Sequence, residues 1–212
     1  KATRFGAIFA LVASVGVIVT GDIQGKIMTE VQPMKMAAAE GLYETTSNAP
    51  FSVLSIGSLD GSEATRIIEI PGLLSFLATG TWDGEVEGIN ELRESEKAMA
   101  LKVAEQYGPD VAALVIVDDY TPNIPLAYWS FRFMMGLGFA TMAAAAATLW
   151  ATRRNLVPQS VLWTWVAILT PLMPVFANRW GWIFTETGRQ PWIVYGLMTT
   201  ATGVSPPVRT TA

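Results

Sequence analysis

Three long stretches of this 212-residue chain are almost free of charged residues. Residues 5–20 and 157–178 carry no charge, and residues 126–151 contain only Arg132. Each stretch approaches the roughly 20 apolar residues that a helix needs to cross a bilayer. Only 15% of the residues are charged and 51% are hydrophobic, which sets the chain apart from ordinary water-soluble domains. We therefore predict an all-α fold, a polytopic bundle of transmembrane helices.

The first apolar stretch has an alternative interpretation. Lys1 and Arg4 precede it, as basic residues precede the apolar run of a secretory signal peptide. However, no small-residue cleavage pattern precedes Gly21, and the sequence does not start with Met. We expect a membrane span, in a chain that begins partway through a longer polypeptide.

Charge is distributed so unevenly that it predicts a topology. All but one of the 18 acidic residues lie between residues 21 and 127, where only six Lys and Arg occur. Pairs of basic residues stand before the first span, at Lys1 and Arg4, and between the second and third spans, at Arg153 and Arg154. Short loops rich in Lys and Arg face the cytoplasm. The acidic segment is therefore expected to be a long extracytoplasmic loop.

These observations divide the chain into six membrane and loop segments, with no nucleic-acid partner. The expected segments are a transmembrane helix (1–20), the extracytoplasmic loop (21–125), a transmembrane helix (126–152), a cytoplasmic turn (153–157), a transmembrane helix (158–186) and an outer-face motif with a tail (187–212).

The loop is expected to contain short helices. Residues 26–43 form a helical pattern, with Gly21-Asp22 as a turn or cap before it, Pro33 suited to a first turn and Gly41 as a breaker.

Further along, residues 45–61 are rich in Ser and Thr and predict irregular chain, while residues 67–71 predict a short extended piece. A second, more polar helix is expected over residues 82–106, followed by re-entry into the membrane at residues 120–125.

The chain contains no cysteine and no histidine. Disulfides and thiolate metal sites are therefore excluded. Imidazole, the commonest metal ligand and a proton shuttle near neutral pH, is also missing. Any metal chemistry must use other ligands or another part of the protein.

Lys35 and Glu40 are candidate functional residues of the loop. At five positions apart, they lie roughly 140 degrees apart around a helix, so they do not form a stacked ion pair. Two separate solvated charges are one interpretation. The surrounding run from Gln32 to Gly41 nevertheless is too apolar for a free surface helix.

Two residues of the second span have competing interpretations. Arg132 lies close enough to the outer edge to extend its charge to the surface, but a guanidinium also suits haem propionates. Met134 is most simply packing material, but a thioether sulfur can be an axial ligand of haem iron.

Glu186 is an acidic residue at the end of the third span. Arg189 lies one turn later and Trp182 one turn earlier, so the three share a face if the helix continues. They could form an interfacial belt at the membrane surface, or part of a cofactor site.

Four motifs in order resemble subunit I of the cytochrome bd quinol oxidases, in the branch with a short quinol loop. The motifs are Gly21-Asp22-Ile23-Gln24-Gly25, the run Gln32 to Gly41, the run Tyr128 to Met134, and Gly181-Trp182 followed by Glu186 and Gly188-Arg189-Gln190-Pro191-Trp192. The resemblance covers almost the whole chain and corresponds to the later portion of the subunit.

This resemblance implies roles for several residues. Lys35 and Glu40 match residues that bind and oxidise quinol. Met134 matches the axial ligand of the low-spin haem b, with Arg132 nearby.

At the end of the third span, Glu186 matches the ligand of the high-spin haem b. Trp182 matches a tryptophan close to the haem pair, and Arg189 is the expected partner of a propionate.

The resemblance also implies an activity, quinol:oxygen oxidoreduction, with electrons passing through the haems b to haem d and reducing O2 to water. The histidine ligands would come from the remainder of subunit I. Subunit II and a small single-span subunit are the other expected protein partners. The alternative is a non-catalytic membrane scaffold or accessory subunit without cofactors. A transporter has little support, since three spans show no broken-helix repeats.

Overall fold

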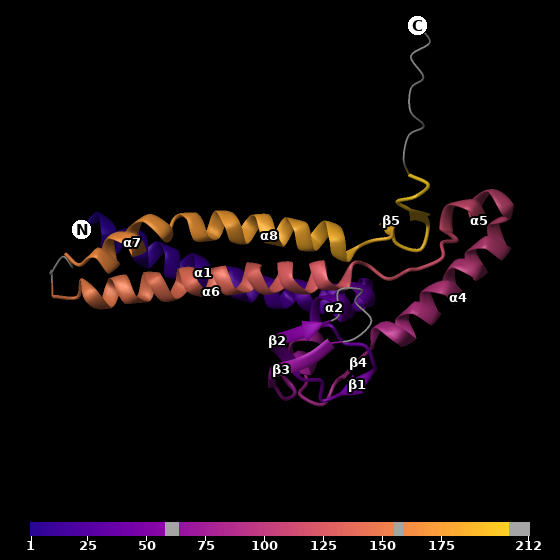
Figure 1. The fold of residues 1–212 in the computed structure, drawn as a ribbon, viewed down its shortest axis with the longest axis horizontal. Coiled ribbons are helices and arrows are strands. Elements are labelled where there is room, and N and C mark those ends of the chain that lie inside the picture. The colour runs from indigo at the N-terminus through magenta and orange to yellow at the C-terminus, as the bar shows by residue number, and fades with distance from the viewer. Residues whose placement is uncertain (58–63, 155–158, 204–212) are drawn as a thin grey trace, which may run out of the picture.

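Three helical rods lie side by side along most of the length of the molecule (Figure 1). The structure, a computed structural model, describes residues 1–57, 64–154 and 159–203. The rods are α1 (Ala2–Val31), α6 (Ile124–Ala151), and the consecutive pair α7 (Val161–Leu169) and α8 (Leu172–Gly188). α1 and α6 are each long and apolar enough to cross a membrane, and α7 with α8 makes a third candidate span with a bend of 41°. The predicted helical membrane fold is confirmed.

The first rod is longer than the sequence pattern predicts. The turn expected at Gly21-Asp22 is wrong, because α1 continues through these residues to Val31. Asp22 and Lys26 are one helical turn apart, and their side chains form an ion pair of 2.7 Å that supports the helix. The position of the membrane surface along α1, expected near residue 20, stays a prediction.

Proline ends the first rod. Pro33 disfavours helical backbone at Gln32, which has a φ of −139° and a ψ of 68°. α2 (Pro33–Glu40) then begins with this proline in its first turn, as predicted. Gly41 ends α2 with a left-handed φ of 59°, which confirms it as the breaker. The helix expected over residues 26–43 is therefore two helices.

The loop also contains two small antiparallel strand pairs. β1 (Thr46–Ser47) pairs with β4 (Glu85–Val86), and β2 (Phe51–Gly57) pairs with β3 (Ala64–Ile70) in the register Phe51↔Ile70. A short helix, α3 (Leu73–Thr79), follows β3.

The prediction of irregular chain over residues 45–61 is wrong for residues 46–47 and 51–57, which form β1 and β2, and residues 58–61 lie outside the described residues. The serines that suggested a loop belong to the buried face of β2, where Ser52 and Ser55 are enclosed. The predicted extended piece agrees with β3 as far as Ile70.

The second half of the loop extends beyond the bundle (Figure 1). The predicted polar helix begins later than expected, as α4 (Ile89–Tyr107), and is followed by α5 (Pro109–Val115). The segment after α8 folds back beside them as β5 (Trp192–Val194) and β6 (Met198–Thr199). α6 begins at the expected re-entry point, where the side chain of Asn123 accepts a hydrogen bond of 3.0 Å from the backbone N–H of Leu126.

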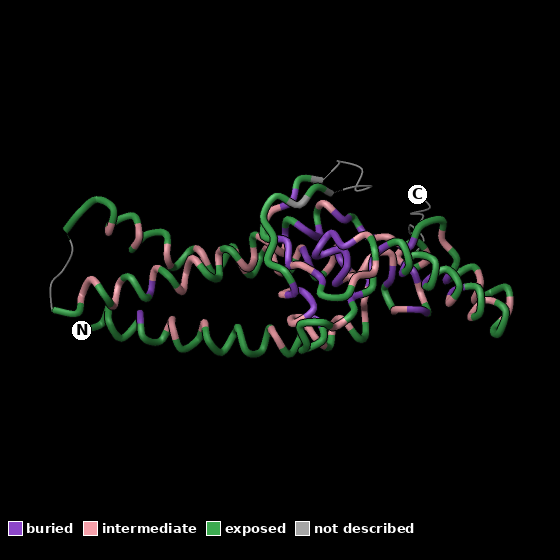
Figure 2. The backbone as a smooth tube through the Cα atoms, turned by 90° about the horizontal axis from the view of Figure 1, so that it is seen from below, coloured by how far each residue is buried: buried purple, intermediate pink, exposed green. Residues whose placement is uncertain are grey.

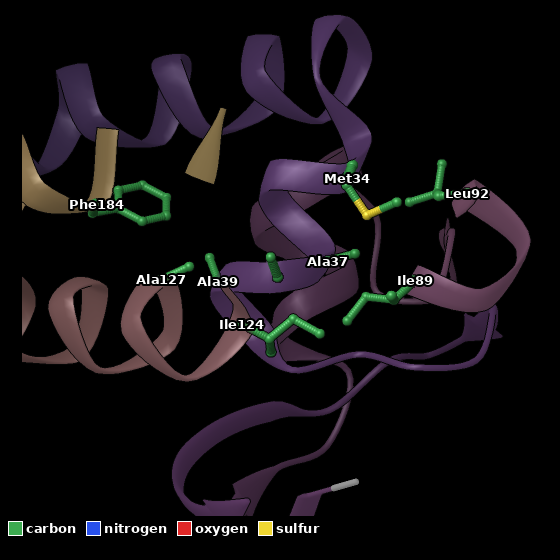
Figure 3. Close-up of a cluster of buried hydrophobic side chains, with 9 residues drawn as sticks. Met34, Ala37, Ala39, Ile89, Leu92, Ile124, Ala127 and Phe184 are labelled. Atoms are coloured by element: carbon green, nitrogen blue, oxygen red, sulfur yellow. The ribbon is translucent and has the colours of Figure 1, made fainter. Parts of the chain in front are cut away.

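The buried core lies at the loop end of the rods and not between them (Figure 2). Its central cluster joins α2 to α4, α6 and α8 (Figure 3), and consists of Met34, Ala37, Ala38, Ala39, Ile89, Leu92, Ile124, Ala127 and Phe184. The alanines of α2 allow the backbones of its neighbours to approach closely. The rods themselves expose large apolar side chains such as Phe5, Phe9 and Val12. Such surfaces suit lipid or further protein.

The two ends of the bundle differ in charge. The N-terminus and the α6–α7 connection lie at one end, and the packed loop lies at the other (Figure 1). Lys1 and Arg4 at the start of α1, and Arg153 just after α6, therefore lie at the end away from the acidic loop. Which side of the membrane each end faces stays a prediction. The turn expected over residues 153–157 is described only as far as Arg154, and the tail only as far as Gly203.

Candidate functional site

A buried ion pair joins the loop to the second rod. Glu40, the last residue of α2, is 3% exposed. Its two carboxylate oxygens face the guanidinium of Arg132 on α6, with Nη2 to Oε2 at 2.6 Å and Nη1 to Oε1 at 3.2 Å. The Arg132 side chain is only 8% exposed. This two-pronged, charge-assisted geometry is the strongest form of such a pair.

The guanidinium of Arg132 is held on all sides. Its Nε donates to the carbonyl of Ser52 at 2.7 Å, and Nη1 also donates to the carbonyl of Ala39 at 3.3 Å. The rings of Phe51 and Tyr128 lie 4.6 and 4.4 Å from its central carbon. Cation–π contacts of this kind are favourable when water is excluded. The interpretation in which Arg132 extends to the membrane surface is therefore wrong, because β2 covers the side chain.

A small group of buried hydroxyls lies beside this pair. The Tyr128 hydroxyl is 3.0 Å from the Ser52 Oγ, which is also hydrogen-bonded to the Ser55 Oγ. Sequence reasoning did not single out these residues. Their spacing could have indicated Tyr128, because it lies one helical turn before Arg132 and on the same face of the helix.

Lys35 lies on another side of α2, in agreement with the predicted angular separation from Glu40. Its Nζ donates to the carbonyl of Thr185 at 3.4 Å and lies 5.2 Å from the centre of the Phe184 ring. Burial lowers the pKa of Lys35, the charge of Arg189 lowers it further, and the charge of Glu186 opposes both. The idea of two separate solvated charges is thus wrong for Glu40, which is buried and paired, while Lys35 is half-buried against α8.

A glycine permits this approach of the two helices. A Cβ at Gly188 would lie 2.9 Å from the Cγ of Lys35. Any larger residue would push the lysine stem away from the end of α8. The glycine of the Gly188-Arg189-Gln190-Pro191-Trp192 motif therefore has a packing role that the sequence alone did not reveal.

The end of α8 presents polar groups on its open face. Glu186 and Arg189 form an ion pair, with 37% and 40% of their side chains exposed, and Trp182 is 69% exposed. Phe184 and Gly188 are the buried residues of this helix and lie on its opposite side. A carboxylate, an indole and a guanidinium are thus available to a group that approaches this face.

Met134 packs where α6 meets α8. A Cβ at Gly181 would lie 2.8 Å from the Met134 sulfur, so the absence of a side chain there makes room for it. The sulfur therefore sits beside the residue that precedes Trp182. The structure brings Met134 close to α8, but it does not bring Met134 and Glu40 into contact.

These residues can supply single axial ligands and not a complete metal site. The described residues contain no group of three or more carboxylate, thiol or imidazole side chains that could hold a metal ion. Glu186 fits a haem that approaches the open face of α8, since its carboxylate is accessible and Arg189 adds a cation for a propionate.

Sequence reasoning missed one further buried carboxylate. Glu96 lies in α4 and is 2% exposed, although the surrounding run is strongly charged. Burial raises its pKa, while hydrogen bonds from Trp192 and Tyr195 act in the opposite direction. The signal was the spacing of Ile89, Leu92, Glu96 and Ala100, which places Glu96 on the apolar face of the helix.

Apolar rods, a packed loop at one end and ligand-type side chains near that end define an integral membrane protein of the helical-bundle class. The sequence profile of the family described as cytochrome bd terminal oxidase subunit I matches residues 1–212. The chain belongs to this family.

Individual relatives agree with this assignment. The chain is 38% identical over 208 residues to cytochrome bd ubiquinol oxidase subunit 1 of Bacillus subtilis (strain 168), covering 97% of this chain and 41% of that protein. It is 27% identical to cytochrome bd-II ubiquinol oxidase subunit 1 of Escherichia coli (strain K12), over 94% of this chain and 47% of the relative.

A solved structure shows the same fold. The bd oxidase from Geobacillus thermodenitrificans superposes with a TM-score of 0.69 at 28% sequence identity, covering 97% of this chain and 42% of the matched chain. The chain thus spans less than half the length of the proteins it matches.

Proposed function

We propose that this chain is part of subunit I of a respiratory terminal oxidase that oxidises membrane quinol at its outer loop and reduces O2 to water. The observation that carries the proposal is the buried pair between Glu40 and Arg132. It fixes the carboxylate of the loop to the helix that bears Met134, only two residues beyond Arg132. Two relatives are named ubiquinol oxidase subunits, which supports the substrate class.

The chemistry of quinol requires a proton acceptor at the place of oxidation. Oxidation of a quinol to a quinone releases two electrons and two protons. Glu40 would accept a proton as its ion pair with Arg132 opens, and positioned acid–base groups of this kind contribute about 10²- to 10⁴-fold to rates. The Lys35 ammonium would orient a quinol oxygen. Since Glu40 is enclosed, direct contact with quinol requires the loop to move apart at the pair.

The remaining residues would hold the haem groups. Met134 would bind the iron of a low-spin haem b and Glu186 that of a high-spin haem b, with Trp182 near the haems. Arg189, which is partly exposed, is suited to an anionic propionate, whereas the guanidinium of Arg132 is already engaged by Glu40 and backbone carbonyls and does not fit that role. These groups and haem d would supply electron transfer and oxygen chemistry, with protein side chains setting their position and electrostatics.

The proposal also assigns partners and a location. The histidine ligands would come from the remainder of subunit I, and subunit II and a small single-span subunit would complete the complex. The bacterial cytoplasmic membrane would contain the three rods, with residues 21–125 on the extracytoplasmic side.

The test is quinol-dependent oxygen uptake by the complete complex with Glu40→Gln. Glutamine keeps the size of the side chain and a hydrogen-bond acceptor for Arg132, but it does not take the proton. We expect the turnover number to fall at least ~10-fold with an unchanged haem spectrum. The control is Glu44→Gln, an exposed glutamate four residues later, which should keep full activity. Full activity of the Glu40→Gln enzyme with ubiquinol and menaquinol analogues would remove Glu40 from the reaction.

A pyridine haemochrome spectrum of the native complex separates the oxidase from a non-catalytic scaffold. The oxidase must contain haem b. A complex without haem would favour the scaffold. A scaffold subunit needs no haem ligands, and this chain has no histidine to supply them.

A further inference from the structure

Glu96 lies where the loop helix α4 meets the segment that follows α8. The indole N–H of Trp192 donates to its Oε2 at 2.8 Å, and the Tyr195 hydroxyl donates to its Oε1 at 3.2 Å. Both oxygens of this carboxylate are therefore occupied by donors from one short segment. Within the described parts of the chain, no cation forms an ion pair with Glu96. Its hydrogen bonds to Trp192 and Tyr195 are thus its main polar contacts.

The contact between Glu96 and Trp192 is closed to water. Trp192 is 3% exposed, and its ring stacks on Tyr120 at 5.5 Å between centroids and meets Tyr195 edge-on at 5.9 Å. The cluster around it includes Ala100 and Val115 from α4 and α5. An indole N–H is only ever a donor. Without Glu96, this N–H would be buried without an acceptor, which is unfavourable.

A second contact ties the same segment to α5. The Thr199 hydroxyl in β6 donates to the carbonyl of Leu114 at 3.2 Å. The segment after α8 therefore touches both helices that extend beyond the bundle, through Glu96 of α4 and through the Leu114 carbonyl of α5.

The first turn of α4 is attached to the other side of the site. The backbone N–H of Ile89 donates to the carbonyl of Leu42 at 2.9 Å, and that of Asn90 donates to the carbonyl of Tyr43 at 3.0 Å. Ile89 and Leu92 also pack against α2 in the central cluster (Figure 3). One helix thus connects the end of α2, which carries Glu40, to the motif that follows Glu186.

We propose that Glu96 is a positioning residue for quinol oxidation, which docks α4 on Trp192 and so holds α2, with Lys35 and Glu40, against the end of α8. The inference rests on the proposed function and adds a residue that acts through the placement of others. Loss of the contact between Glu96 and Trp192 should allow α4 and α2 to move, so that Lys35 and Glu40 are held less firmly in place for quinol. Steps after electron entry should not change.

The first experiment, in the complete complex, distinguishes quinol oxidation at the loop from the electron-transfer steps that follow it. Glu96→Gln keeps the shape but puts an NH2 group against one of the two donors. We expect the KM for quinol to rise about three-fold or more, with a smaller change in kcat. Oxygen uptake driven by an artificial one-electron donor that bypasses quinol should stay within about two-fold of the wild-type rate. The control is Glu94→Gln, an exposed glutamate on the same helix, which should change neither.

The second variant is Trp192→Phe, which keeps an aromatic ring for stacking and removes the N–H. It should raise the KM for quinol in the same way. Combining it with Glu96→Gln should raise the KM little further, because both substitutions disrupt the same hydrogen bond. Hydrogen exchange over residues 89–107 should be faster in both single variants than in wild type.

An unchanged KM for quinol and unchanged exchange in Trp192→Phe would overturn the inference, even if Glu96→Gln fails to assemble. If the wild-type complex does not oxidise quinol, the proposed function fails. In that case the hydrogen-exchange measurement still tests whether Glu96 holds α4 against Trp192.

Discussion

Glu40 and Arg132 show how a charged pair can be placed at the boundary between a loop and a membrane helix. Two unpaired charges there would be costly, but here each satisfies the other, and backbone carbonyls and aromatic rings complete the shell around the guanidinium. Breaking one member of a buried pair typically costs about 3–5 kcal/mol. For this reason a conservative exchange such as Glu40→Gln is a better probe than truncation.

Lys35 provides a prediction about pH. Its pKa is lowered, chiefly by burial and then by Arg189, so the ammonium is lost at a lower pH than in an exposed lysine. Because the pKa of Lys35 is lower in the folded state than in the unfolded state, the fold is most stable with respect to this group above the unfolded-state pKa. That stability is lost as pH falls through the folded-state pKa, where Lys35 gains its proton in its half-buried site. Quinol binding by Lys35 should depend on pH in the opposite direction, because it needs the protonated ammonium. If the ammonium orients quinol, the KM for quinol should rise as pH increases through the lowered pKa.

The measurement is the KM for quinol between about pH 7 and 10 in wild type and Lys35→Arg, whose guanidinium stays charged over this range. The variant should show a flatter profile than wild type. Lys97→Arg, at an exposed position of α4, serves as the control and should follow wild type. Identical profiles for wild type and Lys35→Arg would show that the charge of Lys35 does not orient quinol.

At the residue scale, the sequence identified most of the charged groups that the structure shows to be placed specifically. The angular separation of Lys35 and Glu40 followed from helical geometry alone. The partner of Glu40 did not, because Arg132 is 92 positions away and tertiary contacts of that range leave no periodic signal. Glu96 was overlooked because charged neighbours on both sides hid the apolar stripe to which it belongs.

At the element scale, the contact between α6 and α8 determines where Met134 can point. Gly181 leaves space for the sulfur, and Trp182 follows on the open side of the same helix. A ligand role would require the sulfur to turn toward a haem at this contact.

Replacing Met134 with Leu in the complete oxidase should alter or remove the low-spin haem b signal in the reduced-minus-oxidised spectrum. Gly181→Ala should shift the same signal, since its Cβ would displace the sulfur. Gly138→Ala is the control, because a Cβ at Gly138 meets no atom within 4 Å. A wild-type spectrum in Met134→Leu would leave Met134 as a packing residue.

Elements were predictable where one local rule dominates. Hydropathy located the three rods, and Gly41 marked the end of α2. The start of α2 at Pro33 was not located, because a single helix was expected over residues 26–43. The strand β2 was missed because its buried face carries Ser52 and Ser55, whose composition resembles a loop. The continuation of α1 past Gly21 was missed because glycine suggests a break, although the ion pair of the next turn maintains the helix.

At the scale of the whole molecule, the packed loop and the basic residues occupy opposite ends of the bundle. The complete lack of cysteine in this chain makes its orientation measurable. Glu94→Cys would mark the loop end, and Arg153→Cys would mark the other end; both positions are exposed.

In intact cells that express the complete protein with its other cysteines replaced, a membrane-impermeant thiol reagent should label Cys at position 94. The cysteine at position 153 should react only after the cells are made permeable. The reverse pattern would place the loop in the cytoplasm and contradict the topology.

The central claim is that quinol is oxidised at the loop beside Glu40, which accepts a proton in that step. Its most direct test is rapid mixing of quinol with the oxidised, oxygen-free complete complex, with haem b reduction followed by absorbance. In Glu40→Gln, reduction by quinol should be at least ~10-fold slower than in wild type, while dithionite should reduce the haem fully in both. Reduction of the variant by quinol at the wild-type rate would contradict the claim.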